Sequence, residues 1–388
     1  MYILLIARGI PSKQDPQWGC FEFEQAKALN AFGHKVVVLS VDERFRFNRG
    51  KVGLTYKLVD GIDCYNYCLF PKKISNLFGF SCSSKISEKQ YLFLFNKIIE
   101  EQGLPDIIYS HYLMLSYNAS LLKGYFNIPL VAIEHWSELN KDILIPIAKK
   151  IGNFTYPKVD KLICVSESLK LMVKKHFDKD SVVVHNMIAD NFCDQQLNFT
   201  NTIKIKFVTT GSLIHRKGFD LLPKAFAKLN LPKDKWEMNI IGGGEEYDNL
   251  QNQINSVGLQ DNIHLLGQKT KTEIVDILRE SSAFILPSRN ENFSVAVLEA
   301  LACGLPVISS ICGGIRECIF DFNGLLFSVD DVDALAEAIK YMFENYQSYD
   351  RAKIAEDCKN RFSPEVIARQ LTDVFEKVVE EHKQKQLK

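Results

Sequence analysis

The sequence predicts an α/β protein built from two doubly wound, Rossmann-like domains. Short β-rich runs alternate with helical stretches along the chain, and a polar stretch near the middle interrupts this alternation before it restarts. The β-rich runs are continuously apolar, as expected for parallel strands covered by helices on both faces of a sheet. A chain of 388 residues is long enough for two such domains, each with its own core.

The first domain is predicted over residues 1–188. Its expected strands are residues 3–7, 35–41, 106–110, 130–134, 161–165 and 182–184. Between the first two strands, Phe21, Ala26 and Leu29 lie roughly on one helical face, and Gly33 suits a helix C-cap. The chain therefore opens with a βαβ unit.

A polar segment, 189–202, is predicted to be a linker to a second domain over residues 203–363. Its expected strands are residues 203–210, 237–241, 263–266, 283–287 and 306–310. Asp331 is expected to open a helix, since Leu335 and Ile339 recur at helical spacing. We expect the closing helical segment, 364–388, to return to the first domain.

The composition excludes several classes of protein. The 47 Lys and Arg residues equal the 47 Asp and Glu residues, so a dedicated nucleic-acid binder is disfavoured. The 46% hydrophobic and 24% charged fractions are those of a folded globular protein. No apolar run is long enough for a transmembrane helix, and the N-terminus lacks a basic leader, so we expect a cytoplasmic protein.

Several short motifs favour structural interpretations. The ten cysteines contain no Cys-x-x-Cys pair, and we expect thiols in a reducing compartment. Two Asp-x-Asp runs, 178–180 and 331–333, lie at a turn and a helix start, so we predict no metal site. Tyr247 stands where a dinucleotide fingerprint beginning at Gly242 needs its third glycine, which favours a tight turn.

Two segments of the second half carry chemistry. In 211–220, Arg216, Lys217 and Gly218 lie between a strand and a helix, which suits a phosphate cradle or a solvated basic turn. In 287–307, Glu299 follows Glu291 by eight residues, roughly 12 Å along a helix. A carboxylate in so apolar a helix needs partners, and sugar or ribose hydroxyls are suitable.

These segments resemble the signature of family 4 glycosyltransferases with the GT-B fold. The resemblance rests on Glu291, Glu299 and the segments 304–307, 313–317 and 323–326. Supporting matches cover nearly the whole chain, at 19–25, 131–135, 165–168, 185–188, 242–245 and 266–267. The resemblance implies two domains facing across a cleft, with the donor in the second and the acceptor mainly in the first.

The resemblance implies retaining transfer of a sugar from a UDP- or GDP-sugar to an acceptor hydroxyl, without metal or other cofactor. The expected product is a polysaccharide, capsule, lipopolysaccharide or glycolipid. Its catalytic set maps onto His135, Glu291 and Lys217. Its donor-binding set maps onto Gly19, Ser212, Arg216, Lys217, Gly267, Glu291, Phe293, Ser294, Val295 and Glu299.

Within these sets, the resemblance assigns Lys217 to the diphosphate, Glu299 to the ribose and Glu291 to the sugar hydroxyls. It places His135 near the reacting carbon and Gly19 where backbone approaches the phosphates. His111 follows a strand and either faces the same site or is structural, and it is left outside the catalytic set.

Two positions depart from the family pattern. Ser212 stands where Arg is usual, and Arg216 is the candidate to supply the missing charge. Ser294 stands where Gly is frequent. A nucleotide-sugar epimerase or phosphorylase on the same fold stays open, as does a non-catalytic nucleotide-sugar-binding subunit.

The zero net charge hides a polarised chain. Segment 44–99 holds ten basic and three acidic residues, a net charge of +7, and the remainder carries −7. Because phenylalanines interleave with these cations, we hypothesise peripheral contact with anionic membrane and a lipid-linked acceptor. The alternative is a solvated basic face over core phenylalanines.

Overall fold

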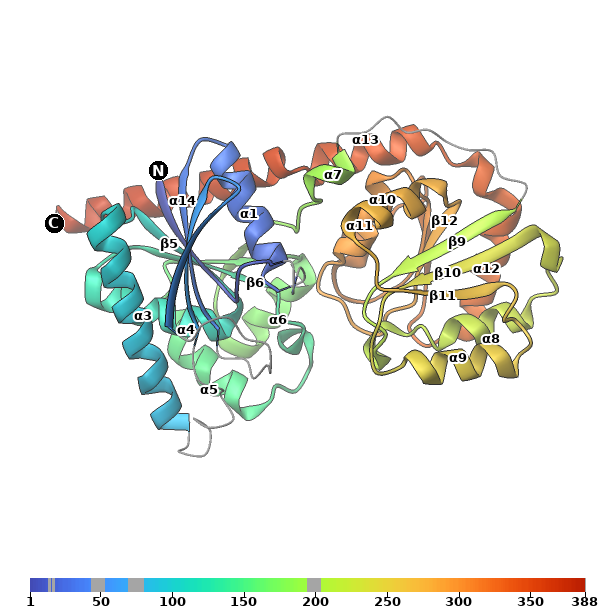
Figure 1. Ribbon diagram of the computed structural model, residues 1–388, viewed down its shortest axis with the longest axis horizontal. Helices are drawn as coiled ribbons and strands as arrows, with labels where there is room; N and C mark the ends of the chain where they lie inside the picture. Colours follow the sequence, from blue (N-terminus) through green and yellow to red (C-terminus); the bar gives the residue numbers. More distant parts are fainter. Residues whose placement is uncertain (13–14, 16–17, 43–52, 69–79, 194–203, 388) are drawn as a thin grey trace. The chain divides into compact units, whose positions relative to one another are not determined.

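The computed structural model describes residues 1–12, 15, 18–42, 53–68, 80–193 and 204–387. Its contacts divide the chain into two compact units. Unit 1 comprises Met1–Val165, Lys170–Val184 and Ile367–Lys388, and unit 2 comprises Ser166–Leu169 and His185–Val366. Figure 1 shows each unit as a twisted sheet flanked by helices.

Unit 1 contains a sheet of eight strands in the order β3-β4-β2-β1-β5-β6-β7-β8. The strands are β1 (Tyr2–Ala7), β2 (Lys35–Asp42), β3 (Gly53–Val59), β4 (Ile62–Cys68), β5 (Ile107–His111), β6 (Leu130–Glu134), β7 (Lys161–Cys164) and β8 (Ser181–Val183). All neighbours are parallel except β3 and β4. The six strands predicted for this domain each agree with an observed one to within one residue at either end.

The hairpin β3–β4 was not predicted, although it lies inside the basic segment. Strand β3 is at the edge of the sheet, and its side chains at 54, 56 and 58 are exposed. An edge strand lacks the continuous apolar run that marks a buried parallel strand. The parts of the basic segment at 43–52 and 69–79 lie outside the described residues.

The helices of unit 1 include the C-terminal one. They are α1 (Cys20–Ala31), α3 (Phe80–Gln102), α4 (Tyr112–Phe126), α5 (Pro146–Thr155), α6 (Glu167–Phe177, whose first residues belong to unit 2) and α14 (Pro364–Gln386). In α14, Phe375 is fully buried and its ring contacts Tyr109 of β5 at 4.9 Å. Thr372 of α14 lies 2.8 Å from the His34 ring.

Unit 2 contains a parallel sheet in the order β11-β10-β9-β12-β13-β14. The strands are β9 (Ile205–Thr210), β10 (Trp236–Ile241), β11 (Ile263–Gly267), β12 (Ala283–Leu286), β13 (Val307–Ser310) and β14 (Gly324–Phe327). The helices are α7 (Asp190–Cys193), α8 (Leu221–Lys228), α9 (Tyr247–Ser256), α10 (Lys271–Glu280), α11 (Val295–Ala302), α12 (Val332–Asn345) and α13 (Arg351–Phe362). This strand order is the Rossmann order, and β14 was not among the predicted strands.

The boundary between the units differs from the prediction at residue 188. Contacts place the division after Val184 and also assign Ser166–Leu169 to unit 2. The predicted linker, 189–202, begins with helix α7, because Ile188 and Phe192 are buried. The rest of that segment, from 194, lies outside the described residues. None of the helices in the described part of the chain is both long and apolar enough to span a bilayer.

Candidate active site

The candidate site lies at the carboxyl edge of the sheet in unit 2. Strand β9 pairs with β10 on one side and β12 on the other. Connections that leave neighbouring parallel strands in opposite directions open a crevice, which is where doubly wound folds bind ligands. The two chemistry-bearing segments, 211–220 and 287–294, follow β9 and β12.

Glycines allow the loop after β9 to pack tightly against its neighbours. A Cβ atom on Gly242 would lie 1.8 Å from the Gly211 carbonyl oxygen, and one on Gly244 would lie 2.3 Å from that of Leu213. Gly218 has φ +68°, and a Cβ there would lie 2.0 Å from the Pro287 carbonyl oxygen. The Gly242–Gly244 turn therefore supports the loop by close backbone packing, in agreement with the tight turn predicted for it.

The loop brings its two cations to Glu291. Lys217 Nζ donates to Glu291 Oε1 at 2.6 Å, and Ser288 Oγ donates to the same oxygen at 2.8 Å. Arg216 Nη1 lies 3.7 Å from Glu291 Oε2 and donates to the Asn290 carbonyl oxygen at 2.7 Å. Glu291 is only 7% exposed, so this carboxylate depends on its partners.

Arg289 holds the loop in place, a role that was not predicted from the sequence. Its guanidinium donates to both Asp220 carboxylate oxygens, at 2.8 and 3.0 Å, to Asp330 at 2.7 Å and to the His215 carbonyl oxygen at 2.6 Å. Burial opposes ionisation of Asp220, but the hydrogen bonds and charge of Arg289 outweigh it and lower the pKa of Asp220. No sequence pattern links residues so far apart.

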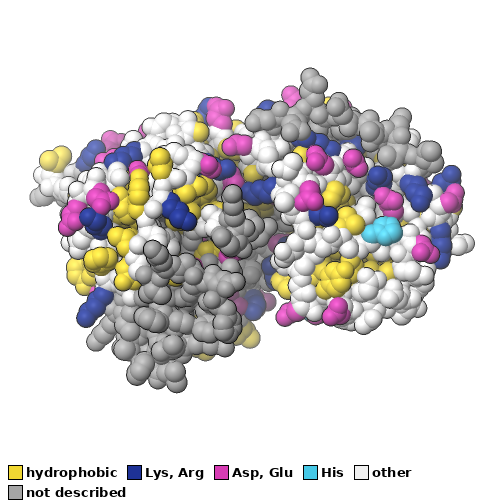
Figure 2. Space-filling model, viewed as in Figure 1, with side chains coloured by type: hydrophobic (Ala, Val, Ile, Leu, Met, Phe, Trp, Pro, Cys, Tyr) yellow, Lys and Arg dark blue, Asp and Glu magenta, His cyan; other side chains and the backbone are white. Residues whose placement is uncertain are grey.

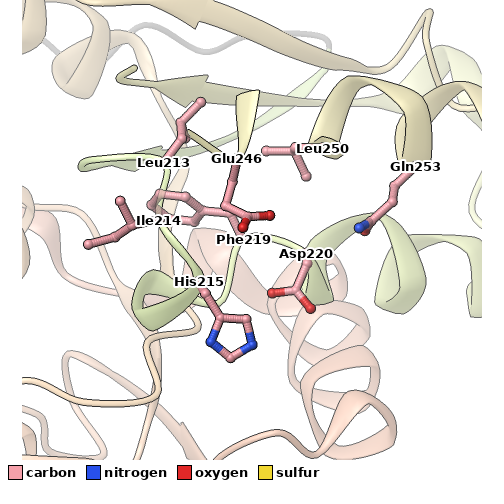
Figure 3. Close-up of a pocket in the computed structure, with 8 residues that line it drawn as sticks. All are labelled: Leu213, Ile214, His215, Phe219, Asp220, Glu246, Leu250 and Gln253. Atoms are coloured by element: carbon pink, nitrogen blue, oxygen red, sulfur yellow. The ribbon is translucent and has the colours of Figure 1, made fainter. Parts of the chain in front are cut away.

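A small pocket lies behind this loop (Figure 3). Leu213, Phe219 and Leu250 supply its apolar wall, and Asp220 and Glu246 add carboxylates. Because the Asp220 carboxylate is already hydrogen-bonded to Arg289, we assign this pocket to the packing that supports the loop and not to ligand binding.

The start of helix α11 presents an anion-binding end. Ser294 is its N-cap residue, and the first amides of a helix have no partner within it. Within the described residues, Ser294 Oγ is buried without a hydrogen-bond partner. Ser294 has φ −77°, so serine replaces the family's frequent glycine here without backbone strain. Val295 and Glu299 share the half-buried face of α11.

Other predicted donor residues take different positions. The Phe293 ring is buried, stacked on His185 at 4.4 Å and in contact with Phe362 at 5.5 Å, and its carbonyl oxygen accepts a hydrogen bond from Asn186 at 2.8 Å. Gly267 ends β11 with φ +69° and open space beside it. Ser212 is exposed at the start of the loop.

Gly19 and His135 belong to unit 1. Gly19 precedes α1 with φ +74°, and a Cβ there would lie 2.1 Å from the Gly9 carbonyl oxygen. His135 directly follows β6, and its ring is stacked parallel to that of His111. The structure thus assembles Lys217, Arg216 and Glu291 in unit 2 and gives Gly19 and His135 their surroundings in unit 1.

The acidic runs and cysteines have structural partners. Asp178 and Asp180 both pair with Lys174, while Asp331 caps α12 and Asp333 pairs with Lys228. Burial raises the pKa of Cys64, Cys303 and Cys318 to about 12, so these thiols keep their protons. In the described ranges, no three His, Cys, Asp or Glu side chains are grouped as metal ligands would be.

Comparisons with known proteins identify the family of the chain. The model for "Glycosyltransferase Family 4" matches residues 23–192, and that for "Glycosyl transferases group 1" matches residues 194–361. An uncharacterized glycosyltransferase of Methanocaldococcus jannaschii is 29% identical over 252 residues, 64% of this chain and 68% of that protein. The phosphatidylinositol N-acetylglucosaminyltransferase gpi3 subunit of Schizosaccharomyces pombe is 23% identical over 95% of this chain and 79% of its own.

A solved structure shares the fold over almost its full length. Anabaena HepE in complex with UDP and glucose has a TM-score of 0.72 and 16% identity, covering 97% of this chain and all of its own. The two family models together cover every candidate residue except Gly19. The chain belongs to the family 4 glycosyltransferases and has their GT-B fold.

Proposed function

We propose that this glycosyltransferase uses a UDP-sugar and retains the configuration of the transferred sugar. The observation that carries the donor proposal is the cluster of Lys217, Arg216 and Glu291 beside the start of α11. Cations and helix amides at a switch point form a site for a nucleoside diphosphate. The UDP and glucose bound to the structurally similar HepE support this donor class.

In this proposal, the diphosphate lies between the two cations and the first turn of α11. Glu291 holds the Lys217 ammonium until a phosphate oxygen takes over part of that contact. Glu299, on the half-buried face of α11, accepts hydrogen bonds from the ribose. Lys217, Arg216 and the first backbone amides of α11 also stabilise the departing diphosphate, so no divalent metal is required.

Lys217→Ala and Glu299→Ala test the donor site. We expect each to reduce kcat/KM for sugar transfer by roughly 100-fold or more. Lys217→Ala removes a preorganised cation from the departing diphosphate, and Glu299→Ala removes a charged acceptor for the ribose hydroxyls. Lys228→Ala, which removes a surface pair with Asp333, is the matched control and should leave transfer unchanged. Wild-type turnover in both site variants, with the fold intact, would refute this assignment.

Thermal-shift measurements with UDP-, GDP- and ADP-sugars identify the donor base, since a ligand that binds only the folded state raises its apparent stability. Transfer should persist in excess chelator, and strict metal dependence would contradict the proposed mechanism. Assays with and without an acceptor separate transfer from epimerase chemistry, which converts the nucleotide-sugar alone.

We also propose that the acceptor is lipid-linked and that the enzyme contacts an anionic membrane. Leu54, Tyr56 and Leu58 are 37%, 52% and 64% exposed along one face of β3 in the basic segment, and Lys57 is exposed beside them. Figure 2 shows exposed hydrophobic side chains interspersed with charged ones on unit 1. The name of the fission yeast relative, which includes phosphatidylinositol, supports a lipid acceptor. Equal sedimentation with neutral and anionic liposomes at low salt would exclude this contact.

A further inference from the structure

The carboxyl edge of the sheet in unit 1 gathers several aromatic and charged side chains. Strand β1 lies between β2 and β5, so its end is the switch point of this sheet. Arg8 follows β1, His111 ends β5, and His135 follows β6, which pairs with β5. These three side chains come from neighbouring strands.

His111 is fully buried, and its ring lies parallel to that of His135, with centroids 5.3 Å apart and an interplanar angle of 1°. Among the described residues, neither ring nitrogen of His111 has a hydrogen-bond partner. A buried polar group without a partner costs about 1–3 kcal/mol, which an apolar ring would avoid. The ring of His111 is therefore held at this position by packing against its neighbours and not by hydrogen bonds to the described residues.

The surroundings of His111 keep its ring uncharged. Burial, His135 and Arg8 together lower the pKa of His111 well below its usual range. The groups around it are Tyr109 of β5, whose ring lies 4.7 Å away, Arg8 after β1 and His135 after β6. His111 therefore presents a flat, neutral face to His135.

Tyr112 supports the His135 ring from another side. Its ring centroid lies 5.1 Å from that of His135, and the Arg8 guanidinium lies 4.3 Å from the Tyr112 ring centroid. Arg8 is itself held by Glu22 through hydrogen bonds of 2.6 and 3.2 Å. Tyr112 has φ +61°, a left-handed conformation that costs roughly 1–2 kcal/mol for such a side chain. Strain of this kind accumulates at functional sites.

We propose that His111 is a positioning residue, whose parallel ring sets the plane of His135 for the transfer step, with Tyr112 as the second support. The inference rests on the proposed role of His135 and adds a residue to it. Since His111 acts through His135, its replacement should lower kcat without weakening donor binding in unit 2.

His111→Phe and His111→Leu form the test pair, because both are apolar and only Phe keeps a flat ring. We expect His111→Phe to retain kcat within about twofold and His111→Leu to reduce it by roughly 10- to 100-fold, since misplaced catalytic groups lose rate on this scale. The KM for donor and the UDP-induced thermal shift should stay near wild type in both. His111→Phe should not lower Tm, because it removes an unpaired buried polar group. Equal, wild-type kcat in both variants would overturn the proposal.

NMR of ring-labelled histidine measures the surroundings of the His135 ring directly. This measurement needs only the Phe variant, so it remains available if His111→Leu does not fold. The His135 signals should be preserved in His111→Phe, and their movement to solvent-like positions there would also overturn the proposal. His135→Ala separates the role of His135 in transfer from the positioning of its ring by His111. If His135→Ala retains wild-type transfer, the proposed role of His135 is wrong, and the NMR signals alone then test whether His111 positions the ring.

Discussion

Single residues at the candidate donor site are held by neighbouring polar and charged groups. Lys217 is positioned by Glu291, Glu291 by Ser288, and the loop that carries Lys217 by Arg289. A long, flexible ammonium loses less entropy on binding when it is already oriented. We therefore expect the geometry of Arg289 to affect donor affinity, although Asp220 and Asp330 neutralise its charge.

Arg289→Lys should lower the free energy of unfolding by about 1–3 kcal/mol, because a lysine cannot replace the bidentate bonds to Asp220. It should also weaken UDP-sugar binding, because the loop that carries Lys217 would lose its contacts with Arg289. Urea unfolding and donor titration measure the two effects. Lys228→Met, which breaks an exposed pair in the same unit, should change neither. An Arg289→Lys protein with wild-type stability and affinity would show that the loop is held by other contacts.

At the scale of elements, the ends of parallel strands carry buried polar groups in both units. In unit 2 these groups face the start of α11, where ion pairs and helix amides suit an anion. In unit 1 the end of β6 instead carries Glu134, which is fully buried. Burial raises the pKa of Glu134 from its ordinary 4.5 to about 8, so the folded protein holds a neutral carboxylic acid there at pH 7.

Glu134→Gln should stabilise the protein at pH 8 and change little at pH 5. Between its ordinary pKa and about 8, Glu134 binds more protons in the folded than in the unfolded state. Folding stability therefore falls as pH rises through this window, by on the order of 1 kcal/mol per pH unit. Urea unfolding at the two pH values measures the difference, with exposed Glu337→Gln as control. An equal effect of Glu134→Gln at both pH values would contradict the neutral acid.

At the scale of the whole molecule, the last helix links the chain's end to its beginning. Helix α14 follows directly after unit 2 in the sequence, yet from Ile367 it belongs to unit 1. Ile367, Leu371 and Phe375 are buried there, and Phe375 contacts Tyr109 of β5. The stability of unit 1 therefore depends on residues that follow unit 2 in the sequence.

Phe375→Ala should destabilise unit 1 by about 3–5 kcal/mol, the usual cost of truncating a buried phenylalanine. The UDP-sugar affinity of unit 2 should be unchanged in protein that remains folded. Hydrogen exchange resolves the two units, and donor titration checks the site. Lys383→Ala, at an exposed position of the same helix, is the control. Faster exchange in unit 2 rather than unit 1 would contradict this assignment.

Much of the fold could be predicted from the sequence, because the central strands are continuously apolar runs and their order along the chain restricts the topology. Glu291 and Glu299 could be named because they share a motif of fixed local spacing, and Lys217 could be named because it lies in a basic loop between a strand and a helix. The sequence also predicted two domains of similar size, although not the division after Val184.

Other features depend on which strands become neighbours, which local patterns do not encode. Arg289 meets Asp220 because β9 pairs with β12, and His111 meets His135 because β5 pairs with β6. The hairpin β3–β4 and the burial of the Phe293 ring against His185 likewise depend on distant contacts. Residues far apart in sequence contribute to one site only after strand pairing has set their positions. The contacts that hold each motif were therefore decided by the tertiary structure.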